Sequence, residues 1–362
     1  MAGPPGISLG GAGFAAGMKA VGVWRFGGPE QLRVVELPDP EPGAGEVRIR
    51  VHAAAVNPTD TLLRAGAQRA RFAAVPPPYR PGMDAAGVVD KLGPELDGRL
   101  QLGQRVVALV LPSGPHGGAY AEQVVVPAAS VVPAPAGADF PAAATLLMNA
   151  LTARVALDSL ALRPGQTHAD TGAAGAFGGY AIQLAKADGL RVIADAAPAD
   201  EELVRTLGAD EVVARGADVA DRIRALVPGG VPGVADGALL NELALPAIAD
   251  GGGLAVVRGW TPASGASGNV GASGTRGISE RGITVHPVLV SRAAADTAAL
   301  DRLRAQAEQG VLTLRVARIL PAAQAEQAHR LLEAGGVRGR LVLDFATGLD
   351  SAPAQVPASA TP

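Results

Sequence analysis

The segment from Thr167 to Asp195 reads THADTGAAGAFGGYAIQLAKADGLRVIAD, and the rest of the chain is organised around it. It begins with a short strand-like run, passes through a glycine-rich turn into a helix-like stretch, and ends in a second strand-like run. Apolar residues recur at the spacing of one helix face, at Phe177, Ala181, Leu184 and Ala185. The order strand, tight turn, helix, strand predicts one unit of a parallel α/β sheet.

The glycines of the turn indicate a ligand. Residues 173–178, AAGAFG, match the dinucleotide fingerprint except that alanine replaces its first glycine. Gly175 would let the backbone approach a pyrophosphate, and Gly178 would let the helix pack closely on the strand. Asp195 follows about 20 positions after Gly175, where a ribose-binding carboxylate belongs. The segment therefore predicts a dinucleotide cofactor, NAD(H) or NADP(H).

Composition excludes several classes of protein. The 362 residues are long enough for two domains, and the net charge of −3 gives no sign of a nucleic-acid or membrane partner. No run of 18 apolar residues is present, so no transmembrane helix is expected. The count of zero cysteines excludes disulfides, thiolate nucleophiles and cysteine-ligated zinc, and it fits a cytoplasmic protein.

The two ends differ in composition from the segments they flank. Residues 1–17 are rich in Gly, Ala and Pro without the pattern of a signal peptide, and the tail is low in complexity, so both ends are expected to be disordered. Residues 18–145 contain short strand-like runs between Gly/Pro turns, such as the alternating run 46–52. These regular short strands predict a barrel or a sandwich.

Residues 146–290 alternate strand and helix patterns, which predicts a parallel sheet. Further strands are expected at 210–213, 233–237, 254–257 and 283–290, and helices at 150–160, 219–226 and 239–249. Ligands bind at the carboxyl ends of strands in such sheets, so the residues that follow these strands should lie beside the motif turn: Gly237, Ala238, Val257, Arg258 and Gly259. The Gly/Ser-rich segment 261–277 is interpreted either as a mobile loop or as an insertion without a role.

Two further stretches resemble a known family. They are residues 56–66, VNPTDTLLRAG, and residues 78–89, PYRPGMDAAGVV. Together with the glycine-rich turn they resemble the medium-chain dehydrogenase/reductase superfamily, in its zinc-free, quinone-oxidoreductase-like and enoyl-reductase-like branch. The resemblance implies a GroES-like β-barrel catalytic domain at 18–145, completed by 291–345, and a doubly wound Rossmann domain at 146–290. It leaves tails at 1–17 and 346–362, and it implies a homodimer.

The resemblance also implies that no metal is bound. Zinc alcohol dehydrogenases of this superfamily have Cys in the stretch that begins here with Asn57, and His where this chain has Met83. An amide and a thioether cannot replace thiolate and imidazole as zinc ligands. The histidines are scattered without ligand spacing, at His52, His116, His168, His286 and His329.

The motif and the resemblance together predict the cofactor contacts. These are Thr152, Ala174, Gly175, Phe177, Gly178, Asp195, Arg215, Ala238, Val257, Arg258 and Gly259. Asp195 would repel a 2′-phosphate and favours NAD(H). Family habit, with Arg215 within reach of an adenosine phosphate, favours NADP(H). The choice stays open at this point, with the expectation leaning to NADP(H).

The predicted reaction is hydride transfer from a nicotinamide to a quinone, an α,β-unsaturated carbonyl compound or an enoyl thioester. Asn57, whose amide carries two donors, is the predicted positioning residue for nicotinamide or substrate. Tyr79 is a candidate proton donor, and Arg64 a candidate contact for the developing oxyanion. Each has a plainer interpretation that stays open: a turn cap for Asn57, a packed ring for Tyr79 and a surface charge for Arg64.

One feature departs from the pattern of a central buried strand, which is rich in Val and Ile. The motif strand carries His168 and Asp170, and a buried charged Asp costs several kcal/mol unless it is paired or protonated. We therefore expect His168 or another cation to pair with Asp170, or the strand to be more exposed. The departure keeps an alternative function open: a scaffold that has lost hydride transfer and serves cyclisation, binding or sensing.

Overall fold

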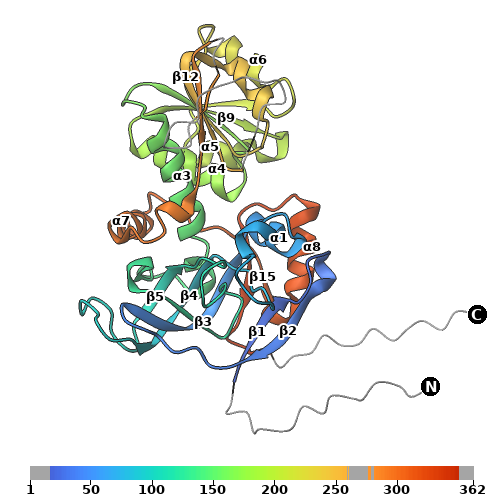
Figure 1. Ribbon diagram of the computed structural model, residues 1–362. Helices are drawn as coiled ribbons and strands as arrows, with labels where there is room; N and C mark the ends of the chain where they lie inside the picture. Colours follow the sequence, from blue (N-terminus) through green and yellow to red (C-terminus); the bar gives the residue numbers. More distant parts are fainter. Residues whose placement is uncertain (1–16, 259, 261–275, 279–280, 350–362) are drawn as a thin grey trace, which may run out of the picture.

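The computed structural model describes residues 17–258, 260, 276–278 and 281–349. Two bodies lie one above the other, a parallel sheet with helices on its faces and a mainly antiparallel sheet (Figure 1). Helix α3 (Leu147–Leu160) lies where they meet and contacts strands of both. The predicted fold class, a GroES-like domain joined to a Rossmann domain, is confirmed.

The parallel sheet has the strand order β10-β9-β8-β11-β12-β14-β13. The strands are β8 (Thr167–Thr171), β9 (Arg191–Ala196), β10 (Glu211–Ala214), β11 (Val231–Asp236), β12 (Ile248–Val256), β13 (Arg276–Ile278) and β14 (Ile283–Pro287). All pairings are parallel except that of β13 with β14. The order reverses between β8 and β11, so the carboxyl ends of these two strands border the crevice where such sheets bind ligands.

The helices around this sheet are α3, α4 (Ala176–Ala187), α5 (Glu201–Thr206) and α6 (Val219–Leu226). The apolar stripe of α4 packs inward as expected, with Ala181, Leu184 and Ala185 fully buried. The helix expected at 239–249 is wrong: the chain forms a 3-10 segment, η5 (Asn241–Ala247). Leu239 and Asn241 adopt positive φ angles of 62° and 53°, and a proline lies inside the segment, so an α-helix cannot form there.

The two polar residues inside the buried strand β8, His168 and Asp170, pair with each other. His168 Nε2 and Asp170 Oδ2 lie 3.1 Å apart, and both side chains are fully buried. Burial raises the pKa of Asp170, and the neighbouring His168 opposes that shift. The expected partner is therefore present, and the alternative of an exposed strand does not hold.

The other body is built on a sheet ordered β15-β16-β3-β4-β5-β7, with β6 also paired to β3. The strands are β3 (Glu46–Val56), β4 (Asp84–Leu92), β5 (Arg105–Leu109), β6 (Gln123–Pro127), β7 (Val131–Pro133), β15 (Val316–Pro321) and β16 (Arg340–Asp344), and β1 (Met18–Val23) pairs with β2 (Leu32–Leu37). The helices are α1 (Pro58–Ala65), α2 (Phe140–Ala143), α7 (Thr297–Glu308) and α8 (Ala325–Ala334). The last strand, β16, pairs with β3 near the start of the chain.

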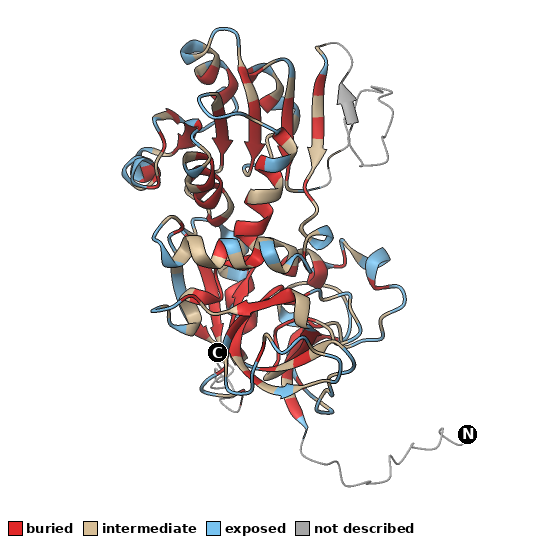
Figure 2. Ribbon diagram, turned by 90° about the vertical axis from the view of Figure 1, so that its left-hand side faces the viewer, coloured by how far each residue is buried: buried red, intermediate tan, exposed pale blue. Residues whose placement is uncertain are grey.

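Apolar clusters fill the interior of both bodies, one of them running between the two, and buried residues lie in the strands of both sheets as well as in helices such as α3 (Figure 2). By length and composition alone, the helical stretch Phe140–Leu160 could cross a membrane. Its most apolar window is 67% buried inside the protein, which is the behaviour of a core helix.

Candidate functional site

The glycine-rich turn after β8 is shaped by close backbone contacts. Gly172 has a φ of +70°, and a Cβ added to it would lie 2.8 Å from the carbonyl carbon of Gly237, which follows β11. A Cβ on Gly178 would lie 2.6 Å from Ala173 Cα. Neither glycine can carry a side chain without moving the backbone. A Cβ on Gly175 would instead meet one atom, Gly172 O at 3.1 Å, so this position leaves space above the start of α4.

An arginine that lies just before β15 in the chain donates hydrogen bonds to two carbonyl oxygens of this turn. Arg315, which precedes β15, donates from Nη1 to Ala174 O at 3.1 Å and from Nη2 to Gly175 O at 2.5 Å. A Cβ on Gly179 would lie only 2.2 Å from Arg315 Nη2, so the guanidinium occupies the space that a side chain there would need. The turn is therefore tied to a segment that lies outside the parallel sheet.

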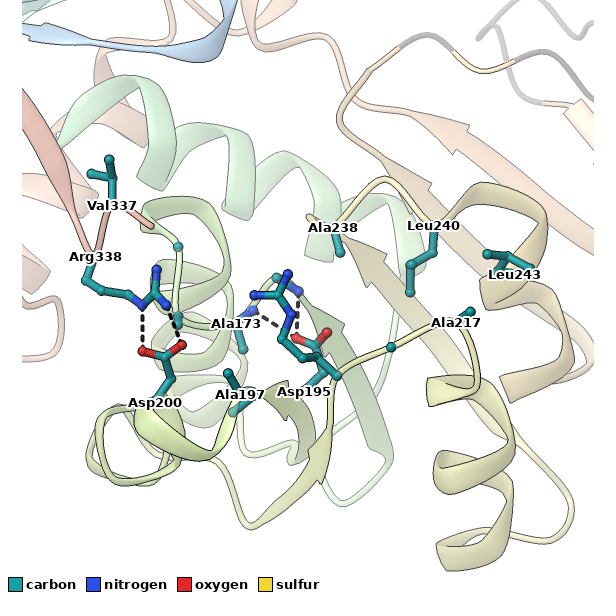
Figure 3. Close-up of a pocket in the computed structure, with 16 residues that line it drawn as sticks. Ala173, Asp195, Ala197, Asp200, Ala217, Ala238, Leu240, Leu243, Val337 and Arg338 are labelled. Atoms are coloured by element: carbon teal, nitrogen blue, oxygen red, sulfur yellow. Dashed lines mark hydrogen bonds and ion pairs between the residues drawn. The ribbon is translucent and has the colours of Figure 1, made fainter. Parts of the chain in front are cut away.

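On one side of the turn lies a cavity of about 460 Å³, which we call the outer cavity (Figure 3). Asp195 Oδ1 accepts hydrogen bonds from Gly172 N at 2.7 Å and Ala173 N at 3.2 Å, and burial raises the pKa of this carboxyl. Across the cavity, Asp200 accepts two hydrogen bonds from Arg338, at 2.5 and 2.6 Å. Arg215 also lines the cavity, where its charge favours the ionised form of Asp195, although its side chain makes no hydrogen bond or ion pair within the described part of the chain.

On the other side lies a cavity of about 220 Å³, the inner cavity, between the two bodies. Gly172 and Gly175 line both cavities, so the two spaces meet at the turn. The parallel-sheet body contributes Phe177, Gly178, Gly237, Leu239, Val257 and Arg258, and the other body contributes Pro58, Thr59 and Arg340. Helix α3 contributes Met148, Asn149 and Thr152.

A buried polar chain, which we call the amide bridge, underlies the inner cavity. Asn57 Nδ2 donates to Asp84 Oδ2 at 2.8 Å, and Asn149 Nδ2 donates to Asn57 Oδ1 at 2.9 Å. Arg340 Nη2 in turn donates to Asn149 Oδ1, and Met148 N donates to Asp84 Oδ1 at 2.8 Å. Burial raises the pKa of Asp84 to about 6. The bridge joins α1, β4, α3 and β16.

A second buried polar group lies behind the bridge. Asp60 accepts hydrogen bonds from Asn57 N and Gly82 N, both at 2.8 Å, and burial raises its pKa to about 7. Tyr120 Oη lies 3.4 Å from Asp60 Oδ2 and 3.3 Å from His329 Nε2. Burial lowers the pKa of His329 to about 3, so the imidazole is neutral in the folded protein at ordinary pH.

The three predicted catalytic residues lie apart from the cavity lining. Asn57 is fully buried within the amide bridge. Arg64 is 2% exposed, and its guanidinium pairs with Glu333 of α8. Tyr79 stacks on Phe26 at 4.6 Å between ring centroids, which matches its plainer interpretation as a packed ring.

The predicted cofactor contacts gather at the two cavities. Ala174, Gly175, Asp195, Arg215 and Ala238 line the outer cavity, and Thr152, Gly175, Phe177, Gly178, Val257 and Arg258 line the inner one. Gly259 lies outside the described residues. No local sequence pattern marks Arg338 and Arg340 as site residues, because their partners Asp200 and Asn149 are 138 and 191 positions away.

Within the described ranges, no three His, Cys, Asp or Glu side chains form a group that could hold a metal ion. Met83, 8% exposed, lies beside Thr59 and Asp60 in a further cavity of about 280 Å³. Zinc-dependent dehydrogenases are expected to have metal ligands at the positions of Asn57 and Met83. In this protein the amide of Asn57 is engaged in hydrogen bonds, and Met83 offers only a thioether.

Comparison with known proteins places this geometry in a family. The alcohol dehydrogenase GroES-like domain model matches residues 43–136, and the zinc-binding dehydrogenase model matches residues 207–343. The quinone oxidoreductase of Sus scrofa is 30% identical over 338 residues, which cover 90% of this chain and 97% of that protein.

Solved structures with a similar fold support the same family. A structure described as an NAD-dependent alcohol dehydrogenase has a TM-score of 0.75 and 33% identity, covering 90% of this chain and 99% of that one. A mycobacterial protein complexed with NADPH has a TM-score of 0.76 and 29% identity, with the same coverage. On its fold, its site and these relatives, the chain belongs to the quinone-oxidoreductase-like branch of the medium-chain dehydrogenase/reductase superfamily.

Proposed function

We propose that this protein is an NAD(P)H-dependent reductase of quinones or α,β-unsaturated carbonyl compounds, enoyl thioesters included. The observation that supports it most directly is that two cavities meet at Gly172 and Gly175. A dinucleotide lying across this turn has its adenosine half in the outer cavity and its nicotinamide half in the inner one. The quinone oxidoreductase relatives support the same class of reaction.

The residues present fit such a cofactor. Gly175 leaves room for a pyrophosphate, and the N-terminus of α4 offers backbone N–H groups without intrahelical partners. The bound cofactor supplies the hydride. Thr152, Phe177 and Val257 border the nicotinamide end, where their largely apolar surface excludes water from the reacting carbon.

For the adenosine end we propose a preference for NADP(H). Asp195, the residue that would repel a 2′-phosphate, is engaged by two backbone N–H groups, which offset part of its charge. Arg215 and Arg338 both line the outer cavity, and Arg215 has no hydrogen-bond partner within the described chain. Arg215 could thus receive a phosphate without breaking a hydrogen bond, while its charge also attracts Asp195.

We further propose that the reaction needs no metal ion. Asn57 and Met83 stand at the positions discussed above, and both oxygen and nitrogen of the Asn57 amide are already used by Asn149 and Asp84. A quinone or enone oxygen needs a hydrogen-bond donor for its developing charge, which a side chain can provide. The protein is also proposed to act in the cytoplasm as a homodimer, with no nucleic-acid or membrane partner.

The test is a titration of purified protein with NADPH and with NADH, followed by nicotinamide fluorescence, and then turnover of neutral quinones and enones. Micromolar binding of NADPH, weaker binding of NADH, and consumption of NADPH with either class of substrate are expected. If neither dinucleotide binds, the proposal fails and the alternative of a repurposed scaffold takes its place. If NADPH binds without turnover of either class, the proposed substrates are wrong.

A further inference from the structure

A further cavity adjoins the inner cavity at α1. It has a volume of about 280 Å³, and we call it the side cavity. Thr59 of α1 lines both spaces, so a molecule whose reacting carbon lies in the inner cavity has the side cavity directly beside it. Among the described residues, none that lines the outer cavity also lines the side cavity, and the glycine-rich turn does not reach it. Under the proposed function, the side cavity is therefore a space for substrate and not for the dinucleotide.

The wall of the side cavity is apolar where it is buried and largely polar where it is exposed. Leu63, Phe72 and Met83 are 2%, 4% and 8% exposed, and they offer a surface on which the carbon framework of a substrate can pack. The exposed lining residues are Arg71, Leu111, Ser113 and Ser291. Pockets that enclose drug-sized molecules have about 300–1,000 Å³, so this cavity suits a small substituent.

The accessible charge of the side cavity is positive. Arg71 and Asp60 are the only ionisable side chains among the described residues that line it. Asp60 is fully buried, and its carboxyl already accepts hydrogen bonds from Asn57 N and Gly82 N. Arg71 is exposed, and its guanidinium makes no hydrogen bond or ion pair within the described part of the chain. A molecule that enters the cavity therefore meets a free guanidinium, whereas the carboxyl is enclosed.

The segment that carries Arg71 is anchored beside the cavity. It is the 3-10 segment η2 (Arg69–Phe72), and the phenyl ring at its end packs edge-on against Tyr79 with 5.8 Å between ring centroids. Just before the segment, Gln68 Nε2 donates to Thr59 Oγ1 at 3.3 Å. This hydrogen bond joins η2 to the residue at which the inner and side cavities meet. The two contacts hold the backbone of η2 at the cavity wall, so the free guanidinium stays near the entrance.

We propose that the side cavity binds a carboxylate-bearing substituent of the substrate, and that Arg71 selects quinones and enones that carry such a group. This inference rests on the proposed function and narrows its substrate class. A carboxylate matches the planar fork of donors of a guanidinium. The side-chain hydroxyls of Ser113 and Ser291 make no hydrogen bond within the described chain and offer further donors. One accessible positive charge suits the single charge of a carboxylate better than the double charge of a phosphate.

The experiment uses substrates that differ only in charge. A quinone and an enone are each prepared with a short side chain that ends in a carboxylic acid or in its methyl ester, and an enoyl thioester of coenzyme A supplies phosphates in place of the carboxylate. Wild type is compared with Arg71→Gln and Arg71→Lys. Arg69→Gln is the matched control, because Arg69 is exposed on the same segment and does not line the cavity. Values of kcat and KM, NADPH affinity by nicotinamide fluorescence, and urea unfolding are measured for each.

Wild type should have a lower KM for each acid than for its ester. Arg71→Gln should raise the KM for the acids about tenfold with little change in kcat, because one charged hydrogen-bond partner of the bound substrate is lost. The KM for the esters, the NADPH affinity and the urea stability should stay within about twofold of wild type. Arg71→Lys keeps the charge without the planar fork and should retain part of the preference, and Arg69→Gln should alter nothing. Added salt should narrow the difference between acid and ester, since an exposed charge is screened.

Several results would overturn the inference while leaving the proposed function intact. These are an active wild type that treats acid and ester alike, or an Arg71→Gln variant with unchanged kinetics. An equal effect of Arg69→Gln would attribute the preference to general surface charge. A loss confined to the coenzyme A thioester would assign Arg71 to phosphates, and weaker NADPH binding would assign it to the cofactor. A wild type that binds NADPH but reduces none of these substrates would overturn the proposed function itself.

Discussion

Two glycines three positions apart in the same turn should respond in opposite ways to alanine. A Cβ on Gly178 would lie 2.6 Å from both Ala173 Cα and Gly172 O, about 0.8 Å inside ordinary van der Waals contact, and both obstacles are backbone. Overpacking of this kind costs about 1–3 kcal/mol, and the better helix propensity of alanine returns up to about 1 kcal/mol. Gly178→Ala should therefore destabilise the folded state by about 1–2 kcal/mol.

Gly175→Ala should leave stability nearly unchanged and weaken cofactor binding. Gly175 has a φ of −71°, which alanine adopts freely, and its added Cβ needs a shift of only about 0.3 Å from Gly172 O. At a helix N-cap the exchange of glycine for alanine costs a few tenths of a kcal/mol or somewhat more. The same methyl group stands where a pyrophosphate would approach, so NADPH affinity should fall at least tenfold, about 1.4 kcal/mol.

Urea unfolding and nicotinamide fluorescence titration of both variants test this pair. Gly229→Ala is the matched control, since a Cβ there meets no atom within 4 Å and its φ is not positive. It should change neither quantity by more than a few tenths of a kcal/mol. If Gly175→Ala binds NADPH as tightly as wild type, the cofactor does not pass over this turn and does not lie across the two cavities.

Three further outcomes follow from the site. Asp195→Asn keeps an oxygen for the N–H groups of the turn but removes a charge. At roughly 6 Å from a doubly charged 2′-phosphate that charge contributes about 1.4 kcal/mol of repulsion in water. The NADPH:NADH affinity ratio should therefore rise about tenfold in fluorescence titrations, and an unchanged ratio would contradict the placement of Asp195. His329 has a pKa of about 3 when folded against 6.5 as its ordinary value, so only the unfolded chain takes up its proton as pH falls below 6.5, and stability drops. His329→Gln should reduce the loss of urea stability between pH 6.5 and about pH 4, and an unaltered pH profile would show that this histidine is not the cause. Dialysis against a chelator should leave NADPH-dependent quinone reduction unchanged, and activity lost and then restored by zinc would disprove metal independence.

Local pattern was enough to predict much of the parallel sheet. Strand β8, the turn and α4 follow directly from the apolar spacing and the glycines between Thr167 and Asp195, and α6 has the expected bounds. The error at 239–249 has a local cause, because an apolar run favoured a helix while positive φ angles and a proline enforced a 3-10 segment. Helix propensity alone does not predict such backbone conformations.

The inner cavity was less predictable, because its polar groups meet only in the folded chain. The residues nearest to the family motifs, Asn57 and Arg64, were natural candidates, yet Asn57 serves the amide bridge and Arg64 pairs with Glu333 across 269 positions. Arg340 looks in sequence like any basic residue before a strand. Its place beside α3 is decided by the pairing of β16 with β3, which no short-range pattern encodes.

The pairing of β16 with β3 also bears on how the protein is made. Residues Ala53–Val56 of β3 find their partners at Leu341–Asp344, about 285 residues later in the chain. At roughly 5–20 residues per second of synthesis, this part of β3 remains an open edge on the ribosome for about 15–60 s while the parallel-sheet body is completed. An unpaired edge invites wrong pairing. Nascent chains halted before β15 should therefore be the forms of this protein that chaperones hold longest.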